Sequence, residues 1–373
     1  MTADASMPLA GTLVLDCTRM LPGGVLMRML LDLGARVIKV EEPGGGDPMR
    51  ATPPLINGTG AGFVSLFRGA QSLCLDLKKE EDASRLAALA KHADVLAESF
   101  RPDTMKAWGL GYDRLAAANP ALVVCSLSGF GAEGPRSRGV GHDLNFAALA
   151  GALGPVSEPS PLPVPLADVA AGLLASSAVL AALLQRGRTG KGAFLDQPLS
   201  AAPLPFLLWP MAEAAAGGGG LWEHLSRGSL PAYRLYRCAD GRGAALCALE
   251  PKFWTAFLDM VHLPELSGLG LDPGPEGRAA AERIQQAMAS KPLAHWVDEA
   301  GARALPLSPV ASLAEAASPA SPLAPYMEAT PAPGGGTLRS PGPAIPSLGT
   351  TPASPAPALG QHTKDILREF GLA

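Results

Sequence analysis

The sequence predicts an α/β protein that has a doubly wound, parallel-sheet large domain and a smaller α/β domain. Short aliphatic runs alternate with helix-forming stretches through the first half of the chain, a pattern typical of βαβ units. The chain has 373 residues, more than one hydrophobic core usually serves, which predicts a second domain. Hydrophobic residues make up 47% of the chain and charged residues 17%, so a large core can be buried.

The large domain is expected to begin with five strands, each a short aliphatic run. The expected strands are Thr12–Asp16, Arg36–Glu41, Ser72–Leu77, Asp94–Glu98 and Leu122–Ser126. The expected helices are Val25–Leu33, Glu80–His92, Tyr112–Ala118 and Asp168–Arg186, with a turn at Leu21–Gly24. A further segment, Ala193–Gln197, precedes an apolar helix that runs to Ala216. In such a sheet, ligands bind beyond the carboxyl ends of the strands.

Four regions are expected along the chain. Residues 1–200 form the large Rossmann-like domain, 201–228 a linker helix, and 229–320 the small domain. Residues 321–373 form a proline-rich return linker and a C-terminal helix that packs on the large domain. Because prolines recur throughout the stretch before this helix, long helices are excluded there.

Composition and charge exclude several classes of protein. A net charge of -4 supplies no general attraction to nucleic acid or anionic lipid. The five cysteines contain no C-x-x-C pair, and the N-terminus lacks the features of a secretory signal, so we expect a cytoplasmic protein. The apolar run Leu166–Leu184 approaches membrane length but carries Asp168, which favours a buried core helix. The first turn, Thr18–Gly24, lacks the G-x-G-x-x-G of nicotinamide enzymes.

Three ionisable residues lie where loops meet predicted elements. His142 precedes a helical pattern, and its neighbour Asp143 suits the cap of that helix. Asp168 stands at the start of an apolar helix, where a plain N-cap is the alternative to a functional role. Glu250 follows an aliphatic run and precedes a proline, so it suits a solvated turn as well as a site. Local pattern alone leaves these alternatives open.

Ordered motifs along the chain resemble the class III CoA-transferase (CaiB/BaiF) superfamily, and within it the α-methylacyl-CoA racemases. The motifs include LPGG, LGARVIKVE, LDLK, ADVL-x-E-x-F-R-P, SLSGFG-x-x-GP, GHDLNF, PLADVAAG, TGKG, LEPKFW and HTKDIL-x-EFG. The similarity runs from about Leu9 to Phe370. His142 and Glu250 are the positions that favour racemase over transferase, since both branches keep the aspartate at position 168.

The resemblance implies roles for the candidate residues. His142 and Asp168 would be opposing bases on the two faces of the carbon next to a thioester, and Glu250, from the partner subunit of an interlocked homodimer, would orient His142. The backbone N–H of Asp143 would bind the enolate oxygen. The CoA-binding residues would be Leu75, Asp76, Leu77, Lys78, Arg101, Gly141, Asn145 and Phe146. No metal or separate cofactor is expected, because CoA is part of the substrate.

The sequence departs from these relatives at phosphate-binding positions. An acid, Glu42, occupies a usual arginine position after the second strand, and Ala70 and Gln71 replace two central cations before LDLK. We expect a racemase or epimerase of 2-methyl-branched acyl-CoA thioesters in lipid metabolism. The alternatives are a CoA transferase that forms an Asp168 anhydride, and a catalytically silent homologue.

Overall fold

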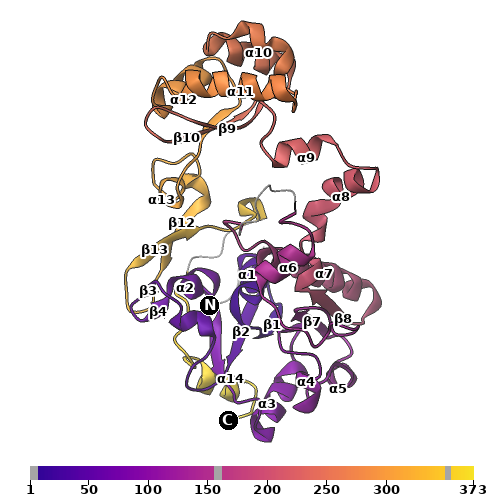
Figure 1. Cartoon of the computed structure of the whole chain (residues 1–373). Coiled ribbons are helices and arrows are strands. Elements are labelled where there is room, and N and C mark those ends of the chain that lie inside the picture. Colours follow the sequence, from indigo (N-terminus) through magenta and orange to yellow (C-terminus); the bar gives the residue numbers. More distant parts are fainter. Residues whose placement is uncertain (1–6, 155–161, 349–353) are drawn as a thin grey trace. The chain divides into compact units, whose positions relative to one another are not determined.

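The computed structural model describes residues 7–154, 162–348 and 354–373, and the chain divides into two compact units (Figure 1). The first unit includes residues up to Ala150, the segment Pro161–Leu204, and Ala317–Ala373; most of the second is Pro205–Ala316. Residues 1–6 and 155–161 of the expected large domain, and residues 349–353 of the expected return linker, lie outside the described residues.

The first unit is built on a six-stranded sheet whose strands are all parallel. The strands are β1 (Leu13–Cys17), β2 (Arg36–Glu41), β5 (Gln71–Cys74), β6 (Val95–Glu98), β7 (Val123–Ser128) and β8 (Ala193–Pro198). Their order is β5-β2-β1-β6-β7-β8, which reverses direction between β1 and β6. This is the doubly wound order of Rossmann folds, and the fold class expected from the sequence is confirmed.

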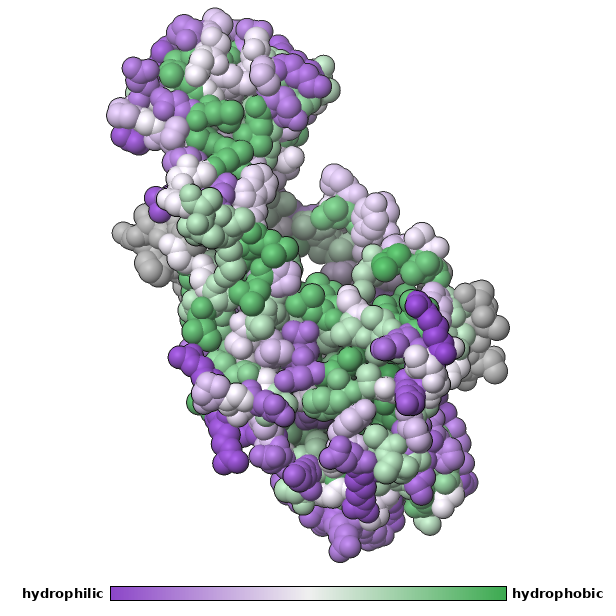
Figure 2. Space-filling view, turned by 90° about the vertical axis from the view of Figure 1, so that its right-hand side faces the viewer, coloured by the Kyte–Doolittle hydropathy of each residue, from purple (hydrophilic) through white to green (hydrophobic). Residues whose placement is uncertain are grey.

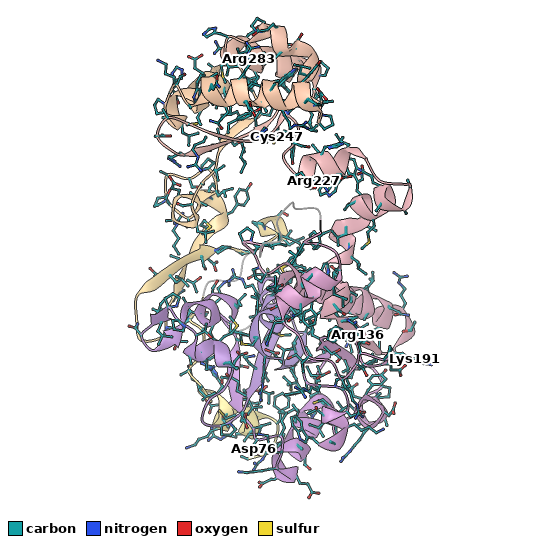
Figure 3. All side chains as sticks on the ribbon, viewed as in Figure 1. Asp76, Arg136, Lys191, Arg227, Cys247 and Arg283 are labelled. Carbon is teal, nitrogen blue, oxygen red and sulfur yellow. The ribbon has the colours of Figure 1, made fainter. Side chains whose placement is uncertain are left out.

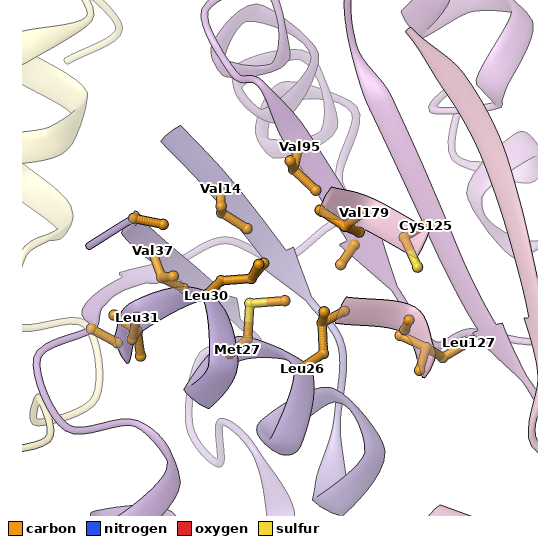
Figure 4. Packing of buried hydrophobic residues seen from close by; sticks show 14 of the residues in the cluster. Val14, Leu26, Met27, Leu30, Leu31, Val37, Val95, Cys125, Leu127 and Val179 are labelled. Atoms are coloured by element: carbon orange, nitrogen blue, oxygen red, sulfur yellow. The ribbon is translucent and has the colours of Figure 1, made fainter. Parts of the chain in front are cut away.

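One face of the sheet is covered by α1 (Met20–Asp32), α2 (Ala61–Leu66) and α7 (Leu166–Thr189). Leu26, Met27 and Leu30 of α1 pack with Val14 of β1 and Val179 of α7 (Figure 4). Small residues along α7 let it approach α1 closely. Although α7 is long and apolar enough to cross a membrane by composition, in this structure it is a core helix of the first unit.

The other face is covered by α3 (Glu80–Ala90), α5 (Tyr112–Ala118) and α14 (Thr363–Glu369), with the short α4 (Thr104–Ala107) beside them. The C-terminal segment lies along the edge strand β5. The backbone N–H of Ser72 donates to Nδ1 of His362 (3.1 Å), and that of Cys74 donates to Oγ1 of Thr363 (3.0 Å). The segment therefore satisfies backbone groups that an edge strand would otherwise leave open.

The LPGG motif, expected as a turn, lies inside α1. Proline is tolerated in the first turn of a helix because its missing N–H has no partner there. Gly23 is required by packing, since a Cβ at this position would lie 1.8 Å from Oγ1 of Thr18. The helix therefore starts five residues earlier than the apolar pattern from Val25 predicts.

The proline-rich return segment is more than a surface linker. Its strands β12 (Met327–Pro331) and β13 (Thr337–Pro341) form an antiparallel hairpin in the first unit. Glu328 of this hairpin pairs with Arg28 of α1 (3.0 Å) and with the buried Arg68, and both arginines also bind Asp32. This network of four charges attaches the hairpin to the N-terminal part of the chain. The remaining short elements of the unit are β3 (Leu55–Ile56), β4 (Thr59–Gly60) and α6 (Asp143–Leu149).

The second unit has its own sheet and core. Strands β9 (Tyr233–Arg237), β10 (Gly243–Cys247) and β11 (Leu307–Pro309) form an antiparallel sheet in the order β11-β10-β9. Helices α10 (Pro251–Met260), α11 (Pro275–Met288) and α12 (Leu293–Ala302) pack around Tyr236, Trp254 and Trp296. Helix α13 (Leu313–Ala316) is the last helix of the second unit, and the 3-10 turn Ala324–Tyr326 that follows in the sequence belongs to the first unit.

The expected single linker helix is replaced by several short pieces. These are two 3-10 turns (Leu199–Ala201 and Leu204–Leu207) and the helices α8 (Leu208–Ala215) and α9 (Leu221–Ser226). Gly217, Gly218 and Gly219 all have positive φ, which ends α8 and separates it from α9. Apolar side chains such as Leu208 and Trp209 are exposed here, and Figure 2 shows hydrophobic surface on both units.

Candidate active site and carrier pocket

A pocket opens at the carboxyl ends of the first unit's strands. Its lining comes from the residues that end or follow β1, β2, β5 and β6. The lining residues are Cys17, Thr18, Arg19, Lys39, Val40, Glu41, Glu42, Gly46, Asp47, Leu75, Asp76, Leu77, Lys78, Phe100 and Trp108. The expected segment Leu75–Lys78 therefore contributes all four residues, of which Asp76 is marked in Figure 3. Doubly wound sheets bind nucleotides at this edge.

The floor of the pocket contains a buried lysine. The ammonium of Lys39 contacts carboxylate oxygens of Asp16 (3.1 Å) and Asp47 (3.0 Å) and the backbone oxygen of Thr18 (3.1 Å). Its side chain is fully buried and lies 4.2 Å from the centre of the Phe67 ring. All three ammonium hydrogens thus have protein acceptors. Lys39 stabilises the strand ends and is not a free cation for a ligand.

The rim of the pocket is aromatic and charged. The rings of Phe100 and Trp108 meet edge to face at 4.9 Å, and the guanidinium of Arg19 lies 5.6 Å from the centre of the Phe100 ring. Lys78, expected to bind phosphate, instead contacts Glu42 at 2.6 Å, and Arg19 contacts the other oxygen of Glu42 at 3.4 Å. The hydrogen bond between Lys78 and Glu42 lowers the pKa of Glu42 and raises the pKa of Lys78. Both rim cations therefore share one anion.

His142, Asp143 and Asp168 come together at the start of two adjacent helices (Figure 1). His142 is the exposed N-cap residue of α6, and its N–H donates to Oδ1 of Asn145 (3.0 Å). The carboxylate of Asp143 accepts a hydrogen bond from the backbone N–H of Asp168 (3.0 Å). Because α7 runs into β8, its first turn lies at the carboxyl edge of the sheet, the same edge as the pocket.

Asp168 is not the N-cap of its helix, contrary to the plain structural alternative. Pro165 holds the N-cap position, and Asp168 is the third helical residue. Its carboxyl is half-buried, and desolvation together with the neighbouring Asp143 charge raises its pKa to about 6, while His142 opposes this shift. His142 stands at the start of α6 next to Asp143, whose carboxylate is hydrogen-bonded to the Asp168 backbone. A carboxyl with this pKa is mostly ionised at neutral pH and is a stronger base than an ordinary aspartate.

The remaining expected residues support or flank the site. Phe146 is buried and packs against Phe130 at 5.4 Å, so its side chain supports the GHD loop and is not available to a ligand. A Cβ at Gly141 would lie 2.9 Å from the Phe146 ring, which explains the glycine. Asn145 caps His142, and Arg101 is exposed one residue beyond the pocket residue Phe100. Asn145 and Gly141 thus position the loop.

Glu250 belongs to the second unit, where it is the N-cap residue of α10. Its side chain is exposed, and its backbone oxygen accepts hydrogen bonds from Phe253 and Trp254 (3.0 Å each). The following Pro251 occupies the first helical position, where proline is favoured. Its expected role as a partner of His142 stays a prediction.

Arg19, Phe100 and Trp108 are among the pocket residues that the sequence interpretation did not name. A signal for the first two was available, since each lies two residues beyond the end of a strand, β1 or β6, at the edge where ligands bind. Trp108 had no such signal. It follows α4 and reaches the pocket only through the packing of that helix.

The structure is thus a doubly wound α/β protein with a pocket at the carboxyl ends of its strands and with His142 and Asp168 at the starts of α6 and α7. The chain belongs to CoA-transferase family III, whose match covers residues 9–363. The crystal structure of a CAIB/BAIF family protein from Brucella suis is similar with a TM-score of 0.83 at 27% identity, covering 98% of this chain and 99% of that one.

Relatives with two different activities are equally similar to this chain. Alpha-methylacyl-CoA racemase of Mus musculus is 32% identical, with 98% of this chain and 94% of the relative covered. Succinyl-CoA:glutarate CoA-transferase of Mus musculus is also 32% identical, with 98% of this chain and 87% of the relative covered. The family is thus an enzyme family acting on acyl-CoA, and overall identity does not distinguish the two reactions.

Proposed function

We propose that this protein is a racemase or epimerase of 2-methyl-branched acyl-CoA thioesters. The observation that carries the proposal is the placement of His142 and Asp168 at the starts of α6 and α7, which a hydrogen bond from the Asp168 N–H to the Asp143 carboxylate joins. A transferase needs only the aspartate, whereas a two-base reaction needs a second proton acceptor on the opposite face of the substrate carbon. An imidazole is such a group.

The reaction requires one base on each face of the α-carbon. One base removes the α-proton, the C–H electrons move into the C–C bond, and the thioester carbonyl becomes an enolate. The protonated group on the opposite face then returns a proton to carbon, which inverts the centre. General acid–base groups of this kind contribute about 10²- to 10⁴-fold each.

Two further residues have roles in the proposal. The Asp143 carboxylate is engaged by the Asp168 N–H, which leaves its own backbone N–H as the expected donor to the enolate oxygen. Glu250 is expected to orient the His142 ring within a cytoplasmic homodimer, where each subunit supplies Glu250 to the other's site. These roles, and acyl-CoA as the substrate, are parts of the same proposal.

The test is α-proton exchange in deuterium oxide with each stereoisomer of a 2-methylacyl-CoA. Wild-type protein should incorporate one deuterium and interconvert the isomers, followed by mass spectrometry and chiral chromatography. His142→Ala and Asp168→Ala should each abolish inversion, and one of them can retain exchange from a single face. Asp113→Asn, which changes an exposed first-turn acid of α5, should behave as wild type.

The second candidate is CoA transfer between carboxylic acids, favoured by the equal identity to the glutarate transferase. In that reaction the Asp168 carboxylate attacks the thioester, and CoA leaves as a thiolate to give an acyl anhydride. Hydroxylamine would trap this intermediate at Asp168. Transfer of CoA to a free acid without α-proton exchange would refute the racemase proposal.

A further inference from the structure

A histidine attaches the C-terminal segment to edge strand β5. Residues 360–372, which we call the C-terminal latch, contain α14 (Figure 1). The backbone N–H of Ser72 on β5 donates to Nδ1 of His362 (3.1 Å), and the backbone oxygen of Ser72 accepts from the His362 N–H (3.0 Å). Oγ1 of Thr363 accepts from the Cys74 N–H (3.0 Å). The latch therefore forms hydrogen bonds with β5 of the kind that a neighbouring strand would form.

The hydrogen bond to Nδ1 requires a neutral imidazole. Nδ1 of His362 can accept only while it carries no proton, so the ring proton is on Nε2. An imidazolium has an N–H at both ring nitrogens. Protonation therefore turns Nδ1 into a donor that faces the Ser72 N–H, and this backbone group loses its acceptor.

The surroundings of His362 favour the neutral ring in the folded protein. Partial burial lowers the pKa of His362 from the ordinary 6.5, the Asp365 carboxylate on α14 opposes this shift, and the Arg36 guanidinium on β2 adds to it. Arg36 is held beside the latch by Glu369, which accepts two hydrogen bonds of 2.6 and 2.7 Å. The His362 ring is half-buried, so solvent can deliver a proton to it.

The other ionisable groups beside the latch form contacts that need no change of proton near neutral pH. The Ser72 hydroxyl donates to Glu41 of β2 (2.7 Å), a carboxylate that is ionised at neutral pH. His92, which follows α3, meets the Phe370 ring at 5.4 Å, and a contact between rings needs no particular proton. His362 is thus a group whose proton decides a hydrogen bond between the latch and β5.

We propose that the C-terminal latch is a pH-sensitive switch, which is closed on β5 while His362 is neutral and opens when His362 takes up a proton. Strand β5 ends at Cys74, and the next four residues, Leu75–Lys78, line the pocket. Opening of the latch therefore loosens the strand that leads into this wall of the pocket. The inference concerns the fold alone and does not depend on the proposed function.

Hydrogen exchange of the full chain, followed by mass spectrometry at pH 7.5 and pH 5, tests the inference. Because the pKa of His362 is lower in the folded protein, the latch should be closed above about pH 6.5 and should open as pH falls below that value. Protection of peptides 70–77 and 360–372, each relative to unstructured peptide at the same pH, should fall about 10-fold at pH 5, as expected for the loss of one hydrogen bond. Peptides from the central strands β1 and β6 should keep their protection.

Two variants of His362 separate its proton from its contacts. In His362→Asn the side-chain oxygen can take the place of Nδ1 and accept the Ser72 N–H at every pH. Its latch should be as protected at pH 5 as at pH 7.5. In His362→Ala the latch should be poorly protected at both values. The matched control is His295→Asn, which replaces an exposed histidine of α12 and should keep the pH dependence of wild type.

Three results would overturn the inference. The first is equal protection of the wild-type latch at both pH values. The second is a loss of protection at pH 5 in His362→Asn as large as in wild type, because another group would then be responsible. The third is a latch in His362→Ala that stays as protected at pH 7.5 as in wild type.

Discussion

Replacing Asp168 with asparagine should stabilise the folded protein at neutral pH while abolishing racemisation. The environment of Asp168 raises its pKa from the ordinary 3.8 to about 6 through desolvation and the Asp143 charge. This shift corresponds to about 3 kcal/mol of unfavourable free energy for the ionised carboxylate. Because the carboxyl is only half-buried, solvent screening reduces the effect, and Asp168→Asn should raise the free energy of unfolding by about 1 to 2 kcal/mol.

The pH dependence has a definite sign. The pKa is higher in the folded state, so as pH falls the folded protein takes up this proton first. The stabilising effect of protonation is complete below about pH 4 and is lost as pH rises through about 6. The difference in free energy of unfolding between Asp168→Asn and wild type should therefore be larger at pH 7.5, and about half as large at pH 5.

Urea unfolding of both proteins at pH 7.5 and pH 5 measures this difference. Asp113→Asn, at the exposed first turn of α5, is the matched control and should lose a few tenths of a kcal/mol because its charge favours the helix dipole. The reasoning is refuted if Asp168→Asn is no more stable than wild type at pH 7.5. A gain that does not shrink toward pH 5 would also refute it.

Two substitutions test the packing of the first unit. Glu328→Gln removes the charge that pairs with two buried guanidiniums, so the free energy of unfolding should fall by about 3 kcal/mol in urea titrations. Glu369→Gln, in an exposed ion pair, should change it by less than about 1 kcal/mol, and equal effects would contradict the buried network. Gly23→Ala would place a methyl group on Thr18 and should lower the melting temperature. Gly187→Ala, in an open position of α7, should raise the melting temperature slightly. A change of melting temperature in the same direction for both variants would contradict the close contact between Gly23 and Thr18.

The strands and most helices of the first unit could be predicted from the sequence because their signals are local. Aliphatic runs such as Arg36–Glu41 coincide with β2, and Tyr112–Ala118 coincides with α5. The spacing of apolar residues along a segment indicates which side chains are buried. The strands of a parallel sheet are buried on both faces, so each is visible in the sequence as a short apolar run. The motifs around His142 and Asp168 were also local, which is why both candidates could be named before their surroundings were known.

Elements that depend on distant partners could not be predicted in the same way. The turn expected at Leu21–Gly24 is helical, and its Gly24 packs against Leu66, a contact that no local pattern encodes. The hairpin of β12 and β13 was expected as linker because prolines dominate its composition. It is attached through Glu328, whose partners lie some 300 residues earlier in the chain.

The sequence by itself determined the alternation of strands and helices, and hence the edge of the sheet where ligands bind, because βαβ connections allow few other arrangements. Only the tertiary structure decided the chemistry at that edge. It partly buries Asp168 and brings Asp143 against it, which together raise the Asp168 pKa, and it pairs Glu42 with Lys78 and Arg19. Charge interactions act across a few ångströms of space, and positions along the chain do not reveal those distances.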